Sequence, residues 1–276
     1  MSERIARAPS AESLGAAPGR ARLAGRRILV VGGGQRVFDA ASDPVGNGRA
    51  MCRLFAREGA HVAVADKDRA SADDTVVAIA REAGRAFAIE ADVTIEADVT
   101  RMLDEATREL GGLDGLVLNV GIGVGALGLA GTKAEAWDLT FAVNVRGAML
   151  CCRAALPALA DGAPIVFISS IAGLTSGSQL PAYDASKAAL GGLMRHVARE
   201  GAARGVRANI VAPGLVDTPL GRVASAGRPS RARSATPFGR QATAWEIAYA
   251  ALFLISDESV YVTAQVLAVD AGITGM

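Results

Sequence analysis

A tyrosine and a lysine four positions apart, Tyr183 and Lys187, are the side chains of this sequence best suited to acid–base chemistry. Residues at positions i and i+4 lie on the same face of a helix, so a helix through this segment would bring the pair together. Free tyrosine titrates near about 10, and a nearby positive charge favours its phenolate form. The pair could therefore exchange a proton with a bound molecule near neutral pH.

Ser170 stands thirteen positions before Tyr183 and strengthens this interpretation. It follows the apolar run 164–168, which the bounding turn residues indicate is a buried strand. A serine hydroxyl at the exit of that strand could hydrogen-bond the same substrate oxygen as the tyrosine. Without the serine, the tyrosine–lysine pair would be better explained as part of a solvated helix face.

Ser170 followed by Tyr-x-x-x-Lys at 183–187 resembles the catalytic pattern of the short-chain dehydrogenase/reductase family, and the resemblance extends over about residues 23–272. It implies that the serine, the tyrosine and the lysine act together with Asn144. In the family, the asparagine kinks its helix and holds a water that links the lysine to solvent. Asn144 also has a simpler explanation, as a polar helix residue bonded to nearby backbone.

Strands and helices alternate along the chain, which predicts a parallel sheet with helices on both faces, the doubly wound α/β or Rossmann fold, in a single domain. The predicted strands are 27–31, 60–66, 85–90, 113–120, 164–168, 206–211 and 265–270, and the predicted helices are 48–58, 96–110, 134–159, 182–201 and 244–254. Ligands of such folds bind beyond the carboxyl ends of the strands. Six candidate residues fall at or just after predicted strand ends, namely Gly32, Asp66, Asp92, Asn119, Ser170 and Pro213.

The first predicted strand ends in a glycine-rich turn, Gly32-Gly33-Gly34, ahead of a helix. Glycine lets the backbone approach a pyrophosphate, and the N-terminus of the helix offers free N–H groups. Members of the family place Gly-x-Gly four residues after the first glycine, whereas here Gly46-Asn47-Gly48 follow about ten inserted residues. The insertion could cover the cofactor, or it could be a surface loop without effect, since loops tolerate added length.

Asp66, at the end of the second predicted strand, bears on the choice of cofactor. Its carboxylate could accept both hydroxyls of an adenosine ribose and would repel a 2′-phosphate, which favours NAD. It could also simply cap the following helix. Arg36 or Lys67 could hold a 2′-phosphate instead, so NADP is possible.

The resemblance implies further contacts with the cofactor. Asp92 would face the adenine ring, Lys187 would bind the nicotinamide ribose, and Thr218 would hydrogen-bond the nicotinamide carboxamide. The residues expected to bind the cofactor are Gly32, Gly34, Gly46, Asn47, Gly48, Asp66, Asp92, Val93, Asn119, Gly121, Tyr183, Lys187, Pro213, Gly214, Val216 and Thr218.

Two segments lack sustained apolar periodicity. Residues 1–23 predict a flexible N-terminal tail, or an arm that packs on a neighbouring subunit, ahead of a domain over 24–276. Residues 215–240 are expected to form a substrate lid, because a long loop in a compact domain is usually a lid or disordered. The basic side chains of the lid hint at an anionic substrate, although solvated charge explains them more simply; they are Arg222, Arg228, Arg231, Arg233 and Arg240.

Composition limits the other classes of function. The formal net charge of +1 predicts no nucleic-acid or membrane-surface partner, and no apolar run approaches the roughly 20 residues of a membrane-spanning helix. Cys52, Cys151 and Cys152 lack metal-ligand spacing, so we expect no metal site and reduced thiols in a cytoplasmic protein. The resemblance implies a homo-oligomer, a tetramer or dimer, that associates through the helices near 134–160 and 182–201.

Together these features predict an oxidoreductase that transfers a hydride between a nicotinamide cofactor, with NAD favoured, and a secondary alcohol or ketone. Two alternatives stay open. One is an NADPH-dependent keto-reductase of the 3-oxoacyl type, in which Arg36 or Lys67 binds the 2′-phosphate. The other is a non-catalytic nucleotide-binding scaffold, which the altered glycine loop favours and the complete catalytic set opposes.

Overall fold

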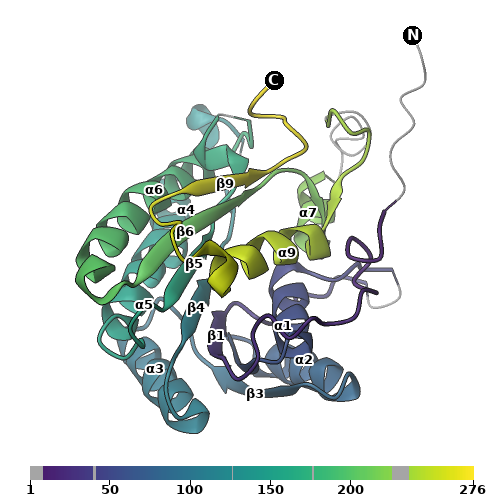
Figure 1. Cartoon of the computed structure of the whole chain (residues 1–276). Coiled ribbons are helices and arrows are strands. Elements are labelled where there is room, and N and C mark those ends of the chain that lie inside the picture. The colour runs from purple at the N-terminus through teal and green to yellow at the C-terminus, as the bar shows by residue number, and fades with distance from the viewer. Residues whose placement is uncertain (1–8, 40–41, 126, 176, 226–235) are drawn as a thin grey trace.

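The computed structural model describes residues 9–39, 42–125, 127–175, 177–225 and 236–276. Their centre is a seven-stranded parallel sheet with the order β3-β2-β1-β4-β5-β6-β9 (Figure 1). The strands are β1 Arg27–Val31, β2 His61–Asp66, β3 Arg85–Glu90, β4 Gly115–Leu118, β5 Pro164–Ile168, β6 Arg207–Pro213 and β9 Val266–Val269. The strand order reverses between β1 and β4, as in a doubly wound sheet, which confirms the predicted Rossmann fold.

Helices cover both faces of the sheet, because its central strands are buried on both sides and form two apolar cores. One core packs the sheet against α1 Asn47–Arg57, α2 Arg69–Arg81 and α9 Ala244–Ile255. The other packs it against α3 Glu96–Leu110, α5 Gly147–Ala155 and α6 Pro181–Gly201. Every residue of the central strands β4 and β5 is buried. This packing fixes the strand ends at which the candidate site lies.

The helix predicted over 134–159 is instead three consecutive elements, α4 Ala134–Phe141, the π-helical turn η2 Ala142–Arg146 and α5. The N–H of Gly147 donates to the carbonyl of Ala142, five residues back along the chain. Such wide turns are frequent at functional sites. The turn contains Asn144, the residue that was expected to kink this helix.

Most other predicted elements differ from the structure only at their ends. The bounds of helix α2 were not predicted, because its buried side chains give little apolar periodicity; they are Ser71, Ala72, Thr75 and Ile79. The segment expected as a lid begins with β7 Val216–Asp217 and α7 Pro219–Ser225, and β7 pairs with β8 Ala242–Thr243. Residues 226–235 lie outside the described residues. Short 3-10 turns lie at Leu129–Gly131, Ile171–Gly173, Ala202–Arg204 and Asp257–Ser259.

Residues 9–23, which the sequence predicted to be a flexible tail or an arm on a neighbouring subunit, lie against the body of this chain. The Ser13 hydroxyl donates to the Glu246 carboxylate at 2.9 Å, and the Thr243 hydroxyl donates to the Ser13 carbonyl at 2.6 Å. Leu23 is fully buried. The segment therefore joins the start of α9 to the rest of the domain, and residues 1–8 lie outside the described residues.

The anchor of this segment on α1 is the carboxylate of Glu58, whose side chain is fully buried. It accepts hydrogen bonds from the N–H groups of Arg20 and Arg22 and, at 2.6 Å, from the Arg22 guanidinium. Burial acts to raise the pKa of Glu58, but the hydrogen bonds from Arg22 and Arg20 outweigh burial and lower it. Their contribution to stability is present above the unfolded-state pKa of about 4.3 and is lost as the pH falls through the folded-state value.

Glu58→Gln should lower the free energy of unfolding at pH 7 by about 1–3 kcal/mol, because an amide offers one acceptor oxygen to three donors. Urea denaturation measures the change, which should shrink below about pH 4 as the wild-type carboxylate protonates. Glu12→Gln is the matched control, because the ion pair of Glu12 with Arg20 is exposed to solvent, and it should leave stability nearly unchanged. Equal effects of the two substitutions would contradict the assignment of Glu58 as the anchor.

Candidate active site

The tyrosine–lysine pair lies in the first two turns of α6, which starts at Pro181, a residue suited to the first helical position. Lys187 is buried, and its Nζ donates to the carbonyl of Ile168 at the end of β5 at 3.0 Å. The same nitrogen lies 5.7 Å from the centre of the Tyr183 ring. The i, i+4 spacing thus brings the cation against the phenol.

Burial of Lys187 lowers the pKa of its amine to about 8. The ammonium form therefore predominates at neutral pH and gives way to the neutral amine above about pH 8. While it is charged, it favours the phenolate of Tyr183 electrostatically.

Ser170 directly follows Ser169 at the exit of β5, and its Oγ accepts a hydrogen bond from the N–H of Ala172 at 3.1 Å. This bond uses the hydroxyl as an acceptor, so the hydroxyl hydrogen can still donate to a substrate oxygen. The neighbouring Ser169 hydroxyl donates to the carbonyl of Lys187 at 2.9 Å. Two consecutive hydroxyls thus serve the site, one holding α6 and the other facing outward from the strand end.

Asn144 is buried in the π-helical turn and joins three parts of the chain. Its Oδ1 accepts from the N–H of Ile122 at 2.8 Å, and its Nδ2 donates to the Ile122 carbonyl and the Ser186 hydroxyl, both at 2.9 Å. These bonds hold the segment after β4 against α6. That segment includes Gly121, where a Cβ atom would lie 2.8 Å from the Nζ of Lys187. The role of Asn144 in a proton relay stays a prediction.

The turn after β1 requires glycine at two positions. Gly32 has a positive φ of 82°, and a Cβ atom at Gly48 would lie 2.0 Å from the Gly32 carbonyl oxygen. Asn119, just after β4, donates to the same carbonyl at 2.7 Å. The start of α1 therefore packs directly on the turn, as a backbone must when it approaches a phosphate.

The start of α1 suits the pyrophosphate of a dinucleotide. Its N-cap residue, Gly46, provides no side-chain hydrogen bond to the first turn, so the helix N–H groups are open to an anion. The Oδ1 of Asn47 is buried and has no hydrogen-bond partner among the described residues. An acceptor in this state fits a donor group of a ligand, so the residues present fit a nicotinamide dinucleotide.

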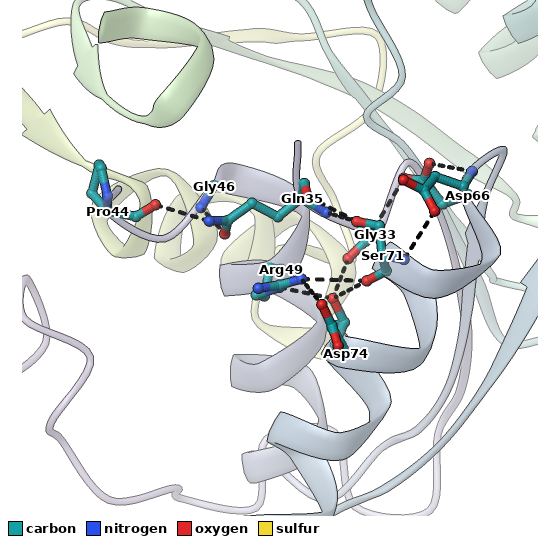
Figure 2. A network of polar contacts seen from close by, with 11 residues as sticks. Gly33, Gln35, Pro44, Gly46, Arg49, Asp66, Ser71 and Asp74 are labelled. Atoms are coloured by element: carbon teal, nitrogen blue, oxygen red, sulfur yellow. Dashed lines mark hydrogen bonds and ion pairs between the residues drawn. The ribbon is translucent and has the colours of Figure 1, made fainter. Parts of the chain in front are cut away.

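Asp66 ends β2 beside this turn (Figure 2). Its carboxylate accepts from the N–H of Gly34 at 3.0 Å and from that of Asp68 at 3.1 Å, and it retains further lone pairs. The cap of α2 is Asp68, which accepts from the N–H of Ser71 at 3.2 Å. Asp66 therefore orders the glycine turn and is not itself the helix cap.

The remaining sequence-predicted residues lie at the same edge of the sheet. Asp92 accepts from the N–H and hydroxyl of Thr94, at 2.8 and 2.7 Å, just beyond β3, with Val93 buried next to it. The Thr218 hydroxyl accepts from the N–H of Gly221 at 3.0 Å at the start of α7. The others are Pro213, which ends β6, Gly214, which follows it, and Val216 in β7.

The two described arginines of segment 215–240 provide no support for an anionic substrate. Arg222 pairs with Asp217, and Arg240 pairs with Glu246. The other three, Arg228, Arg231 and Arg233, lie outside the described residues. Within the described part of the chain, no cluster of three or more His, Cys, Asp or Glu residues is placed to hold a metal ion.

Residues that hold the predicted catalytic residues in place, without belonging to the catalytic set, were not predicted from the sequence. Ser186 and the Ile168 carbonyl are examples, and neither belongs to a motif. Ser169 and Ser186 do carry a weak signal, because each is the immediate neighbour of a predicted catalytic residue. Their partners become apparent only when β5, η2 and α6 are packed together.

Gly48→Ala should weaken binding of NADH at least about tenfold, because the added methyl cannot fit 2.0 Å from a backbone oxygen without moving α1 away from the turn. Calorimetric titration measures the dissociation constant. Gly192→Ala in α6 is the matched control, since no atom lies within 4 Å of the added methyl, and binding should be unchanged. An alanine at position 48 that binds NADH as well as the wild type would show that the close approach is not needed.

The burial of Lys187 should also be visible in the pH dependence of stability. The folded pKa of about 8 lies below the unfolded value of 10.5, so the unfolded chain binds more protons between these pH values and stability should rise with pH there. The stability difference between wild type and Lys187→Met, measured by urea denaturation, should therefore grow in favour of the wild type from pH 8 to 10.5. The same comparison for Lys67→Met, which removes an exposed lysine, is the matched control. A flat difference for both variants would refute the buried charge.

Comparisons with known proteins place this geometry in context. The family model described as enoyl-(acyl carrier protein) reductase matches residues 41–274. The 2-(S)-hydroxypropyl-CoM dehydrogenase 3 of Xanthobacter autotrophicus is 36% identical over 92% of this chain and 99% of that protein. A cis-4-hydroxycyclohexanecarboxylate dehydrogenase of Sinomonas cyclohexanicum is 38% identical over 88% and 98%, respectively. A short-chain dehydrogenase of Burkholderia cenocepacia solved in complex with NADP superposes with a TM-score of 0.81 at 32% identity, covering 92% of this chain and 100% of that one.

Proposed function

The chain belongs to the short-chain dehydrogenase/reductase family, and we propose that it interconverts a secondary alcohol and a ketone with Tyr183 as the proton acceptor and donor. It is a nicotinamide-dependent oxidoreductase, and relatives that match it over nearly their whole length are named as dehydrogenases of hydroxylated compounds. The observation that carries the proposal is the buried ammonium of Lys187 beside the Tyr183 ring, at the exit of β5.

In the direction of alcohol oxidation, the Tyr183 phenolate takes the proton of the substrate hydroxyl, and the Ser170 hydroxyl donates a hydrogen bond to the same oxygen. Lys187, held by the Ile168 carbonyl, keeps its positive charge next to the phenol and so favours the basic form at neutral pH. A nicotinamide cofactor held at the glycine turn and the start of α1 would supply the acceptor for the hydride that leaves the substrate carbon. In the reverse direction the phenol returns the proton as the carbonyl is reduced.

We propose NAD as the cofactor, because the Asp66 carboxylate stands at the end of β2 and would repel a 2′-phosphate. The NADPH-dependent keto-reductase is the second candidate. Two N–H groups already bond to the Asp66 carboxylate, and the exposed Arg36 lies two residues after Gly34, where it could bind a 2′-phosphate. A solved relative is also in complex with NADP.

Two finer expectations accompany this function. A homo-oligomer through the α4–α5 and α6 helices is supported by the exposed apolar side chains of Leu139 and Met149. A cytoplasmic location is supported by three buried free thiols, Cys52, Cys151 and Cys152. Separately, none of the helices in the described residues combines the length and apolar character that a bilayer crossing requires.

Tyr183→Phe tests the proposed chemistry. A panel of cyclic and short-chain secondary alcohols is screened with NAD and with NADP, and turnover in the variant should fall by about 10²–10⁴ because the proton acceptor is lost. Titration with NADH and NADPH should show nucleotide binding largely intact in the variant, and the nucleotide that the wild type binds more tightly identifies the cofactor. Tyr261→Phe removes the same hydroxyl from a fully exposed tyrosine and should change nothing. Wild-type turnover in Tyr183→Phe would end the assignment.

A further inference from the structure

The insertion, at about residues 35–45, lies between the glycine turn and α1. The side chain of Gln35, at its start, bonds to the main chain at its end (Figure 2). Its Oε1 accepts from the N–H of Gly46 at 2.8 Å, and its Nε2 donates to the carbonyl of Pro44 at 3.1 Å. The main chain of Gln35 is fixed as well, because its N–H and carbonyl both bond to the Ser71 hydroxyl of α2. Gln35 thereby holds Gly46, the N-cap residue of α1, in a fixed position beside the glycine turn.

The described residues beyond this neck are also hydrogen-bonded. The Asp43 carboxylate accepts from the N–H groups of Phe38 and Asp39, at 2.7 and 2.9 Å. The carbonyl of Ser42 accepts from the Nη1 of Arg222 at 2.6 Å. The insertion therefore contacts α7, which follows it by about 180 residues in the sequence.

Arg222 is itself held in place from the other side. Its Nε and Nη2 donate to the two carboxylate oxygens of Asp217, at 2.7 and 3.0 Å, in the bidentate arrangement that a planar guanidinium favours. Its backbone N–H donates to the carbonyl of Thr218 at 2.8 Å. One side chain thus connects the insertion to residues 216–218, the segment expected on the nicotinamide side of the site.

We propose that the insertion is a brace across the cofactor site, and that Gln35 and Arg222 are positioning residues that fix the start of α1 relative to residues 216–218. This inference rests on the proposed function, because it concerns the same cofactor. The described residues on either side of 40–41 are tied at the neck and at Ser42 without a nucleotide, so binding does not have to form these two contacts. An insertion without effect would need neither tie.

A double-mutant cycle tests whether the two ties act as one unit. Gln35→Ala opens the neck and Arg222→Ala releases Ser42, and the two residues share no hydrogen-bond partner. Each variant should weaken binding of NADH or NADPH, whichever the wild type prefers, by about tenfold in calorimetric titration. The double variant should weaken it by about tenfold as well, because the brace is already broken by either change. If the two residues acted independently, the double variant would bind the nucleotide about a hundredfold more weakly than the wild type.

Two controls separate a brace from general damage. Arg204→Ala removes an arginine that likewise pairs with an aspartate, Asp161, and bonds a carbonyl, that of Leu156, away from the site, so nucleotide binding should be unchanged. Val223→Ala shortens the exposed side chain next to Arg222 in α7 and leaves both ties in place, so it should also bind normally.

Unchanged binding in either single variant, an additive double variant, or an equal loss in Arg204→Ala would overturn the brace while leaving the proposed function standing. A wild-type protein that binds neither nucleotide would overturn the proposed function and the brace with it. The expected non-additive loss, with a melting temperature close to that of the wild type, would establish Gln35 and Arg222 as positioning residues.

Discussion

In the proposed mechanism the ammonium of Lys187 has to remain charged although it is buried, and the contacts of this side chain tie together the elements at the carboxyl edge of the sheet. Burial lowers the pKa of the Lys187 amine to about 8, so the charged form predominates at neutral pH but the pKa lies only slightly above that pH. The Ile168 carbonyl at the end of β5 provides an acceptor, and glycine at position 121 leaves room for the amine. Strand β5, the segment after β4 and helix α6 must therefore meet at one point.

The π-helical turn makes this meeting possible. A regular helix over 134–159 would present its side chains at a uniform spacing, whereas the extra residue in the turn re-aims the chain at Asn144. The Asn144 amide then bonds in both directions to the main chain of Ile122, much as a neighbouring strand would, and also to Ser186. Asn144 thus ties the segment after β4, which passes close to the Lys187 amine at Gly121, to helix α6.

Two segments that depart from the family pattern are integrated into the fold by the same kind of contact, a side chain bonded to main-chain groups. Glu58 binds the N–H groups of Arg20 and Arg22 in the N-terminal segment, and Gln35 binds the main chain on both sides of the insertion neck. Such contacts require a backbone N–H or carbonyl group at the right position, and almost any residue type can provide one. They leave no motif in the sequence.

The sequence by itself determined the alternation of strands and helices, the parallel sheet and the catalytic candidates, because apolar periodicity and the Tyr-x-x-x-Lys spacing are local properties. It also placed six candidate residues, Ser170 among them, at strand ends, which in a parallel sheet share one edge. Only the tertiary structure decided that residues 9–23 are packed, that Asp68 and not Asp66 caps α2, and that the helix containing Asn144 opens into a π turn. These outcomes depend on partners many residues away, such as Glu246 for Ser13 and Ile122 for Asn144, and a local pattern carries no information about them.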